Sequence, residues 1–133
     1  MTLHRIRRPL AATVAALAFA ITHAAAAAST DAPARDEIDH LLHYVAVSSC
    51  TFVRNGAAYP ADKASEHLAS KYHFVGARIA TAEDFIKYLA TQSSMSGEPY
   101  HVKCGKTDAL SGAWLAAELD RYRKTPHLQQ VSR

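Results

Sequence analysis

The sequence predicts one small α+β domain in which about four helices pack on a short two-stranded antiparallel ribbon. Three observations lead to this prediction. The chain has 133 residues, a length that suits a single domain. Apolar residues recur at helical spacing in four stretches, and two short runs carry strand patterns. Cys50 directly precedes the first of these runs and Cys104 closes the second, so a disulfide between them would hold the two strands side by side.

Residues 1–28 have the pattern of a cleavable export signal. Three arginines precede an apolar run over residues 10–21, and the alanines of residues 24–28 provide the small side chains that a signal peptidase needs. We place the cleavage after Ala28. An uncleaved anchor is disfavoured because the run is short and rich in alanine. We therefore expect a periplasmic protein that meets the membrane only transiently, through this signal peptide.

The charge balance changes once the signal peptide is removed. The whole chain has a formal net charge of +3, but residues 29–133 contain 12 basic and 12 acidic residues and are neutral. A neutral domain lacks the basic surface of a nucleic-acid-binding protein, so nucleic acid is excluded as a partner.

The two cysteines favour a structural disulfide. An even cysteine count in a small exported domain is typical of a bridge, and this one would close a loop of 55 residues, stabilising the fold by about 4 kcal/mol. A catalytic redox pair or a metal site is disfavoured because the cysteines lack the close spacing of a Cys-x-x-Cys motif.

The first half of the domain is predicted to contain a helix, a strand and a second helix. The helix spans Asp36–Ser48, where the residues of one face are apolar. The strand Thr51–Arg54 is rich in β-forming residues and ends at the turn signal Asn55-Gly56. Tyr59-Pro60 then opens the second helix, with proline near its first position, and Gly76 ends it.

The second half is predicted to contain a third helix, a strand and a last helix. Thr81 is the expected N-cap of the third helix, ahead of an acidic first turn. Residues 93–99 form a loop, and Tyr100–Cys104 alternates as a strand does. Ser111 or Asp108 caps the last helix, which runs to Arg123. Residues 29–123 thus form one globular domain without an internal repeat, and residues 124–133 form a flexible tail.

Histidines suggest a metal site, but an incomplete one. His40 and His43 are three residues apart on the first helix, with Asp36 and Asp39 one turn earlier. These four residues lie opposite the apolar face, which fits a metal site and an ordinary solvated surface equally well. The solvated surface is favoured because no third and fourth ligands can be identified.

Two other polar groups are candidate binding residues. Arg54 and Asn55, beside the exposed amides of a turn, suit a carboxylate or a phosphate, with a plain turn as the alternative. His67 and Lys71 lie one helical turn apart and could hold an anion, with surface charge as the alternative. The serines of residues 93–96 lack the motif of a nucleophile, so they are interpreted as a connector.

Four ordered runs of residues resemble the YfeK-like family of small exported proteins of Gram-negative bacteria, a domain of unknown function. The runs are residues 50–56 (CTFVRNG), 66–68 (EHL) with Lys71, 78–86 (RIATAEDFI) and 93–102 (SSMSGEPYHV). The resemblance covers about Glu37 to Leu115. It implies a periplasmic single-domain protein and brings no catalytic assignment.

The favoured functional hypothesis is a non-catalytic binding module of the cell envelope, whose partner is an envelope protein or a small ligand and which needs no cofactor. The residues to test first are Arg54, Asn55, His67, Lys71, Arg78, Ser94 and Tyr100. One alternative is a small hydrolase or transferase centred on His67, which requires a serine or carboxylate beside that ring. The other alternative is a divalent-metal-binding protein that uses His40 and His43.

Overall fold

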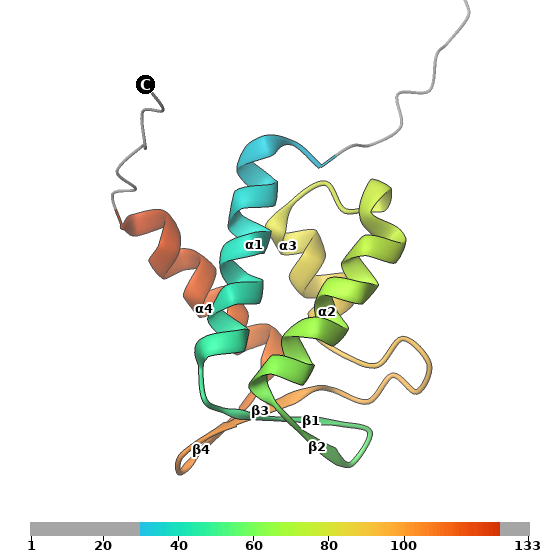
Figure 1. Ribbon diagram of the computed structural model, residues 1–133, viewed down its shortest axis with the longest axis vertical. Helices are drawn as coiled ribbons and strands as arrows, with labels where there is room; N and C mark the ends of the chain where they lie inside the picture. Colours follow the sequence, from blue (N-terminus) through green and yellow to red (C-terminus); the bar gives the residue numbers. More distant parts are fainter. Residues whose placement is uncertain (1–29, 126–133) are drawn as a thin grey trace, which may run out of the picture.

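The computed structural model describes residues 30–125, so the predicted signal peptide and most of the predicted tail lie outside the described residues. Helices and strands follow one another as α1 Ala32–Val47, β1 Thr51–Arg54, β2 Ala57–Pro60, α2 Ala61–Val75, the 3₁₀ turn η1 Gly76–Arg78, α3 Ala82–Phe85, the π-helical η2 Ile86–Ala90, β3 His101–Cys104, β4 Thr107–Leu110 and α4 Ser111–Lys124. The helices gather on one side of the sheet (Figure 1). No helix in this part of the chain is long and apolar enough to cross a membrane.

The sheet has four strands, so the predicted two-stranded ribbon is wrong. Its order is β2-β1-β3-β4, and every neighbouring pair is antiparallel. The two predicted strands, β1 and β3, form the central pair, and each is followed by a hairpin partner at the edge. The edge strands were missed because Ala57–Pro60 consists of alanine, tyrosine and proline, and Thr107–Leu110 includes an aspartate; both runs have low β propensity.

The helix boundaries next to the edge strands differ from the prediction accordingly. Tyr59 belongs to β2, and Pro60 both ends that strand and is the N-cap of α2. Asp108 lies within β4, and Ser111 is the first residue of α4, whose N-cap is Leu110 without a side-chain hydrogen bond. The predicted caps of the last helix are therefore wrong.

The antiparallel pairing of β1 with β3 and the bridge between Cys50 and Cys104 are as predicted. The Cα atoms of the two cysteines are 4.6 Å apart. Thr51 pairs with Lys103 and Val53 with His101, so the start of β1 lies beside the end of β3. The disulfide therefore joins the two central strands at this end.

An internal repeat, which the sequence did not reveal, organises the fold. α3, β3, β4 and α4 each begin 50 residues after α1, β1, β2 and α2. The order helix-strand-strand-helix therefore occurs twice, and we call residues 31–75 the first unit and residues 81–125 the second unit. The helix-capping residues Asp31 and Thr81 also stand 50 residues apart, and each accepts a backbone N–H three residues later.

The register of the central strands places a pseudo-twofold axis between the units. Phe52 pairs with Val102, its own counterpart 50 residues later, and the flanking pairs of β1 and β3 are exchanged by the same relation. The main departure from this symmetry lies in the first helix of each unit. α1 continues to Val47, whereas α3 passes into η2 and ends at Ala90.

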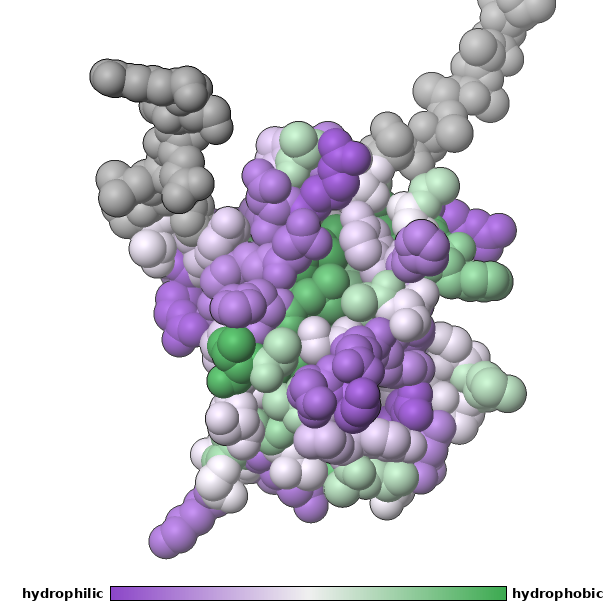
Figure 2. Space-filling view, in the orientation of Figure 1, coloured by the Kyte–Doolittle hydropathy of each residue, from purple (hydrophilic) through white to green (hydrophobic). Residues whose placement is uncertain are grey.

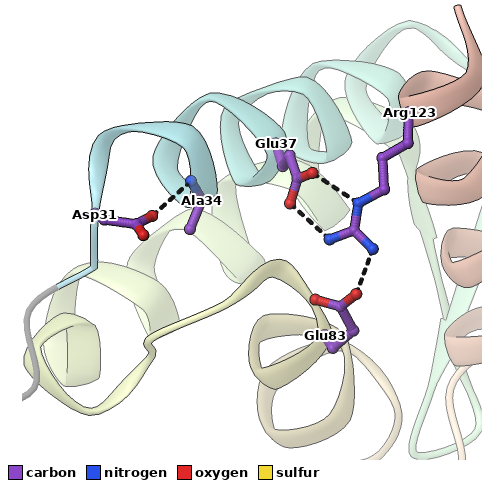
Figure 3. Close-up of polar contacts among 5 residues, drawn as sticks. All are labelled: Asp31, Ala34, Glu37, Glu83 and Arg123. Carbon is purple, nitrogen blue, oxygen red and sulfur yellow. Dashed lines mark hydrogen bonds and ion pairs between the residues drawn. The ribbon is translucent and has the colours of Figure 1, made fainter.

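The core lies between the helices and one face of the sheet. The predicted apolar faces are confirmed, and the largest fully buried apolar side chains are Ile38, Leu41, Val45, Ile79, Phe85, Val102 and Leu115. Val102 and Phe52 are side chains of the sheet that belong to this core, because alternate residues of a strand point to the same side. α1 begins four residues before the predicted Asp36, because Asp31 accepts a hydrogen bond from the Ala34 amide at 2.9 Å (Figure 3).

Arg123, near the C-terminal end of α4, joins three helices (Figure 3). This end of α4 points away from the sheet (Figure 1). Its Nε and Nη2 atoms lie 2.7 and 2.9 Å from the two carboxylate oxygens of Glu37 in α1, and Nη1 donates to Glu83 in α3. The hydrogen bond from Arg123 lowers the pKa of Glu83, and the two carboxylates raise the pKa of Arg123. The C-terminal end of α4 is thereby fastened to both units.

Candidate functional site

A cavity of about 460 Å³ lies between α2 and the face of the sheet that the helices cover. Its lining comes from β1, β2, α2 and the residues beside β3 and β4, namely Phe52, Val53, Arg54, Tyr59, Lys63, Ala64, Glu66, His67, Leu68, Ser70, Tyr100 and Ser111. Three of the predicted site residues, Arg54, His67 and Tyr100, are among them. Its volume is within the range of roughly 300–1,000 Å³ that is usual for small-molecule sites.

Arg54 lines the cavity because the side chains of β1 point alternately to the two faces of the sheet. Phe52 and Arg54 occupy positions of the same parity, so they lie on the same side of the sheet. The guanidinium carbon of Arg54 is 4.6 Å from the ring centre of Tyr59, a cation–π contact. Its Nη1 atom lies 2.8 Å from both ring nitrogens of His67. Strand and helix therefore bring together two residues that the sequence placed in separate groups.

His67 is held in its neutral form. An arginine side chain only donates hydrogen bonds, so the ring nitrogen that accepts from Arg54 carries no proton. Burial lowers the pKa of His67, and the positive charges of Arg54 and Lys71 lower it further. A neutral imidazole has one N–H group, so while one ring nitrogen accepts from Arg54 the other carries the proton.

Tyr100 lines the cavity, and Lys71 lies next to it outside the lining. Lys71 Nζ donates to the Leu89 carbonyl at 2.8 Å and lies 3.4 Å from the hydroxyl of Tyr100 and 5.3 Å from the centre of its ring. Tyr100 is buried, and this burial raises its pKa, while the charge of Arg54 opposes the rise. Burial lowers the pKa of Lys71, as does the charge of Arg54. Lys71 therefore contributes positive potential to the cavity without lining it.

The charges around the cavity are not balanced. Within residues 30–125, neither Arg54 nor Lys71 makes an ion pair with a carboxylate. Lys63 and Glu66, the other charged lining residues, pair with each other at 2.8 Å and are exposed. Figure 2 shows hydrophilic side chains gathered over the first half of α2, the half that carries this pair. The interior of the site is therefore positive and can attract an anion.

Asn55 does not line the cavity; it joins the β1–β2 hairpin to the loop of residues 93–99 by hydrogen bonds. Its backbone has a φ of 49°, as the predicted Asn-Gly turn requires. The Ser96 hydroxyl donates to Asn55 Oδ1 at 2.7 Å, and Asn55 Nδ2 lies 3.5 Å from the hydroxyl of Ser93. Ser93 is buried and also accepts from the Ser96 amide. These serines act as a connector, in agreement with the sequence interpretation.

Arg78 and Ser94 are not brought to the cavity. Arg78 ends the η1 turn and Ser94 lies in the loop before β3, and both are exposed. Sequence reasoning in turn missed Tyr59, Lys63 and Ala64 as lining residues. The signal for Tyr59 was its even spacing from Ala57, which becomes informative only once this segment is known to be a strand.

The alternative sites gain no support from the geometry. Arg54 is the hydrogen-bond partner of His67, and no serine or carboxylate in residues 30–125 hydrogen-bonds to its ring. His40 Nε2 lies 2.6 Å from Glu118 Oε1, and the His40 ring stacks on Tyr122 at 3.9 Å, while His43 is exposed. The described residues contain no group of three or more His, Cys, Asp or Glu side chains that could hold a metal ion.

Comparison with known proteins identifies the family. Residues 32–123 match DUF5329, a family of unknown function. The chain belongs to the DUF5329 family. The uncharacterized protein YfeK of Salmonella typhimurium is 48% identical over 50 residues, a stretch that covers 38% of this chain and 42% of YfeK. The predicted resemblance to YfeK-like proteins is thus confirmed.

No solved structure matches this DUF5329 protein. The region that matches DUF5329 contains all but the terminal residues of the two units and every residue that lines the cavity. The site can therefore be described as part of the family domain. Its ligand has to be argued from its chemistry.

Proposed function

We propose that this DUF5329 protein is a non-catalytic binding protein of the cell envelope whose cavity takes a small organic anion. The observation that carries the proposal is the positive charge at the cavity: Arg54 lines it and Lys71 lies next to its lining residue Tyr100, and neither cation has a carboxylate partner in residues 30–125. A guanidinium presents several N–H groups in one plane and can bind both oxygens of a carboxylate. The neutral ring of His67 supplies a further N–H donor beside it.

Binding is favoured over catalysis because the polar groups of the cavity are not arranged as a nucleophile and a base. A general base must be free to take a proton from the reacting group. Here the accepting nitrogen of His67 faces Arg54, and burial, together with the positive charges nearby, lowers the pKa of the ring and with it the basicity. The same arrangement suits the recognition of negative charge, since Arg54 is a cation and Glu66, the one carboxylate in the lining, is already paired with Lys63.

The location in the envelope is supported by two independent features. The N-terminal sequence has the pattern of an export signal, and the bridge between Cys50 and Cys104 is compatible with an oxidising compartment. Recovery of the protein from the periplasmic fraction without residues 1–28, measured by mass spectrometry, is the expected result. A full-length cytoplasmic protein would contradict this part of the proposal.

Calorimetric titration of the purified protein with sodium acetate, sodium benzoate and inorganic phosphate tests the binding proposal. We expect saturable binding of at least one of these anions, and about a tenfold to hundredfold loss of affinity in Arg54→Gln, because a hydrogen bond to a charged group contributes about 1.5–3 kcal/mol. Lys106→Gln is the matched control, since Lys106 is an exposed cation in the β3–β4 turn. The absence of binding heat with every anion, or equal losses of affinity in both variants, would contradict the proposal.

A further inference from the structure

The pseudo-twofold axis provides a direct comparison for the cavity, because the second unit contains the corresponding place. The residues that stand 50 positions from Ala64 and Arg54 are Trp114 and Cys104. Tyr100, which precedes β3, corresponds to Cys50, which precedes β1. The pair formed by Arg54 and Tyr100 in the cavity is thus replaced at the other end of the central strands by the disulfide.

The corresponding place in the second unit is filled. The indole ring of Trp114 stacks on Tyr44, with ring centres 4.5 Å apart, and meets Phe52 edge-on at 5.7 Å. Trp114 is half-buried and packs against the hydrophobic core. A tryptophan at this position of the second helix is therefore compatible with the fold, and its ring lies between that helix and the sheet.

The first unit has the same order and spacing of elements but lacks the ring. Ala64 supplies only a methyl group where the second unit has an indole, and Ala64 lines the cavity. Its walls include Phe52, Tyr59 and Leu68, which offer apolar surface to a flat ring. Arg54 and His67 stand at the same cavity and would meet a negative group attached to that ring.

We propose that the cavity is specific for an anion that bears a flat apolar ring of about indole size. The ring takes the place that the Trp114 side chain takes in the second unit, and the anionic group binds Arg54 and His67. This inference rests on the proposed anion-binding function and names its ligand class. Ala64 is then the residue that determines specificity, because its small side chain leaves room for the ring.

Calorimetry with three probes separates the ring from the charge. We expect indole-3-acetate to bind about tenfold or more tightly than acetate, because burial of the ring removes apolar surface from water, and also more tightly than uncharged indole. Equal affinities for acetate and indole-3-acetate would overturn the ring inference and leave the anion-binding function intact. Equal affinities for indole and indole-3-acetate would remove the role of the charge, and no binding of any probe would remove the proposed function itself.

The variant Ala64→Trp tests the assigned position. We expect the new ring to fill the cavity and to weaken indole-3-acetate binding about tenfold or more, while thermal unfolding shows an intact fold. Ala117→Trp is the matched control, because Ala117 is exposed on α4 and corresponds to His67. A folded Ala64→Trp protein that binds indole-3-acetate as the wild type does would overturn the proposal.

A second measurement applies if Ala64→Trp fails to fold. Nuclear magnetic resonance of the wild-type protein with indole-3-acetate should then show shifts at the backbone amides of Ala64, His67 and Leu68. Shifts confined to α4 and β4 would place the probe elsewhere and overturn the assignment. The leucine of Ala64→Leu fills less of the cavity, so this variant should weaken indole-3-acetate binding less than Ala64→Trp does.

Discussion

The contact between Arg54 and His67 shows how single residues set the chemistry of the cavity. An arginine at 2.8 Å can donate to an imidazole only if the accepting nitrogen is unprotonated. Because the pKa of His67 is lowered in the folded protein, the unfolded chain binds its proton first as the pH falls below about 6.5. His67 therefore reduces the stability of the fold on acidification from that pH down to its own folded pKa.

A titration of the His67 ring in the variant Arg54→Gln should reveal the two causes of its lowered pKa. Removal of the guanidinium should raise the midpoint, but the midpoint should remain below that of a free histidine, because burial is the larger cause and persists. The measurement is a nuclear magnetic resonance titration of the ring protons between pH 4 and pH 8. Lys106→Gln should leave the midpoint unchanged. An unshifted midpoint in Arg54→Gln would contradict the contact.

Some of the individual residues at the site could be predicted from the sequence. Arg54, His67 and Lys71 were selected because their types suit an anion, and Tyr100 because it lies in a family-like run; the fold brings these four together. Asn55 was selected as an anion-binding residue, and Arg78 and Ser94 because they lie in the family-like runs; these three do not line the cavity. Residue type indicates a chemistry, but convergence depends on which strand faces which helix, and this could not be read without the two edge strands.

At the scale of helices and strands, the elements with strong local patterns were predictable. α1 and α4 carry apolar residues at helical spacing, and β1 carries β-forming residues. β2 and β4 have neither signal, because each is a four-residue edge strand that is held by one neighbour. Their pairing is specified by the hairpin turns and by the strand beside them, which lie outside the local pattern.

The variant Arg123→Gln should test the contact of Arg123 with Glu37 and Glu83. The three side chains are partly exposed, so we expect a loss of only about 0.5–1 kcal/mol in the free energy of unfolding. The loss should shrink in 1 M sodium chloride, because salt screens exposed ion pairs. Urea unfolding at low and high salt measures both effects. Lys124→Gln, the exposed neighbour, is the control; an equal loss in both variants would contradict a specific contact.

At the scale of the whole molecule, the two units are joined through the central strands and the disulfide. The repeat could not be read from the sequence, because corresponding residues such as Ala64 and Trp114, or Arg54 and Cys104, differ in size and chemistry. What the units share is the spacing of their elements and the position of their caps. The difference between the corresponding places, one filled and one hollow, is what distinguishes the site.

Removal of the disulfide should lower stability without abolishing the pairing of β1 with β3. The chain-entropy argument gives a loss of about 4 kcal/mol for the double variant with both Cys50 and Cys104 replaced by alanine. Urea unfolding of this variant, beside the wild type with and without reductant, measures the loss. Addition of reductant to the variant should change nothing, and a wild type insensitive to reductant would show that the bridge adds no stability.

The position of the bridge has a consequence for a chain that is cut. Cys50 belongs to the first unit and Cys104 to the second, so a protease nick between Arg78 and Thr81 would leave both fragments covalently attached through sulfur. On a gel, such a nicked molecule would migrate as one species until a thiol is added, and only then as two.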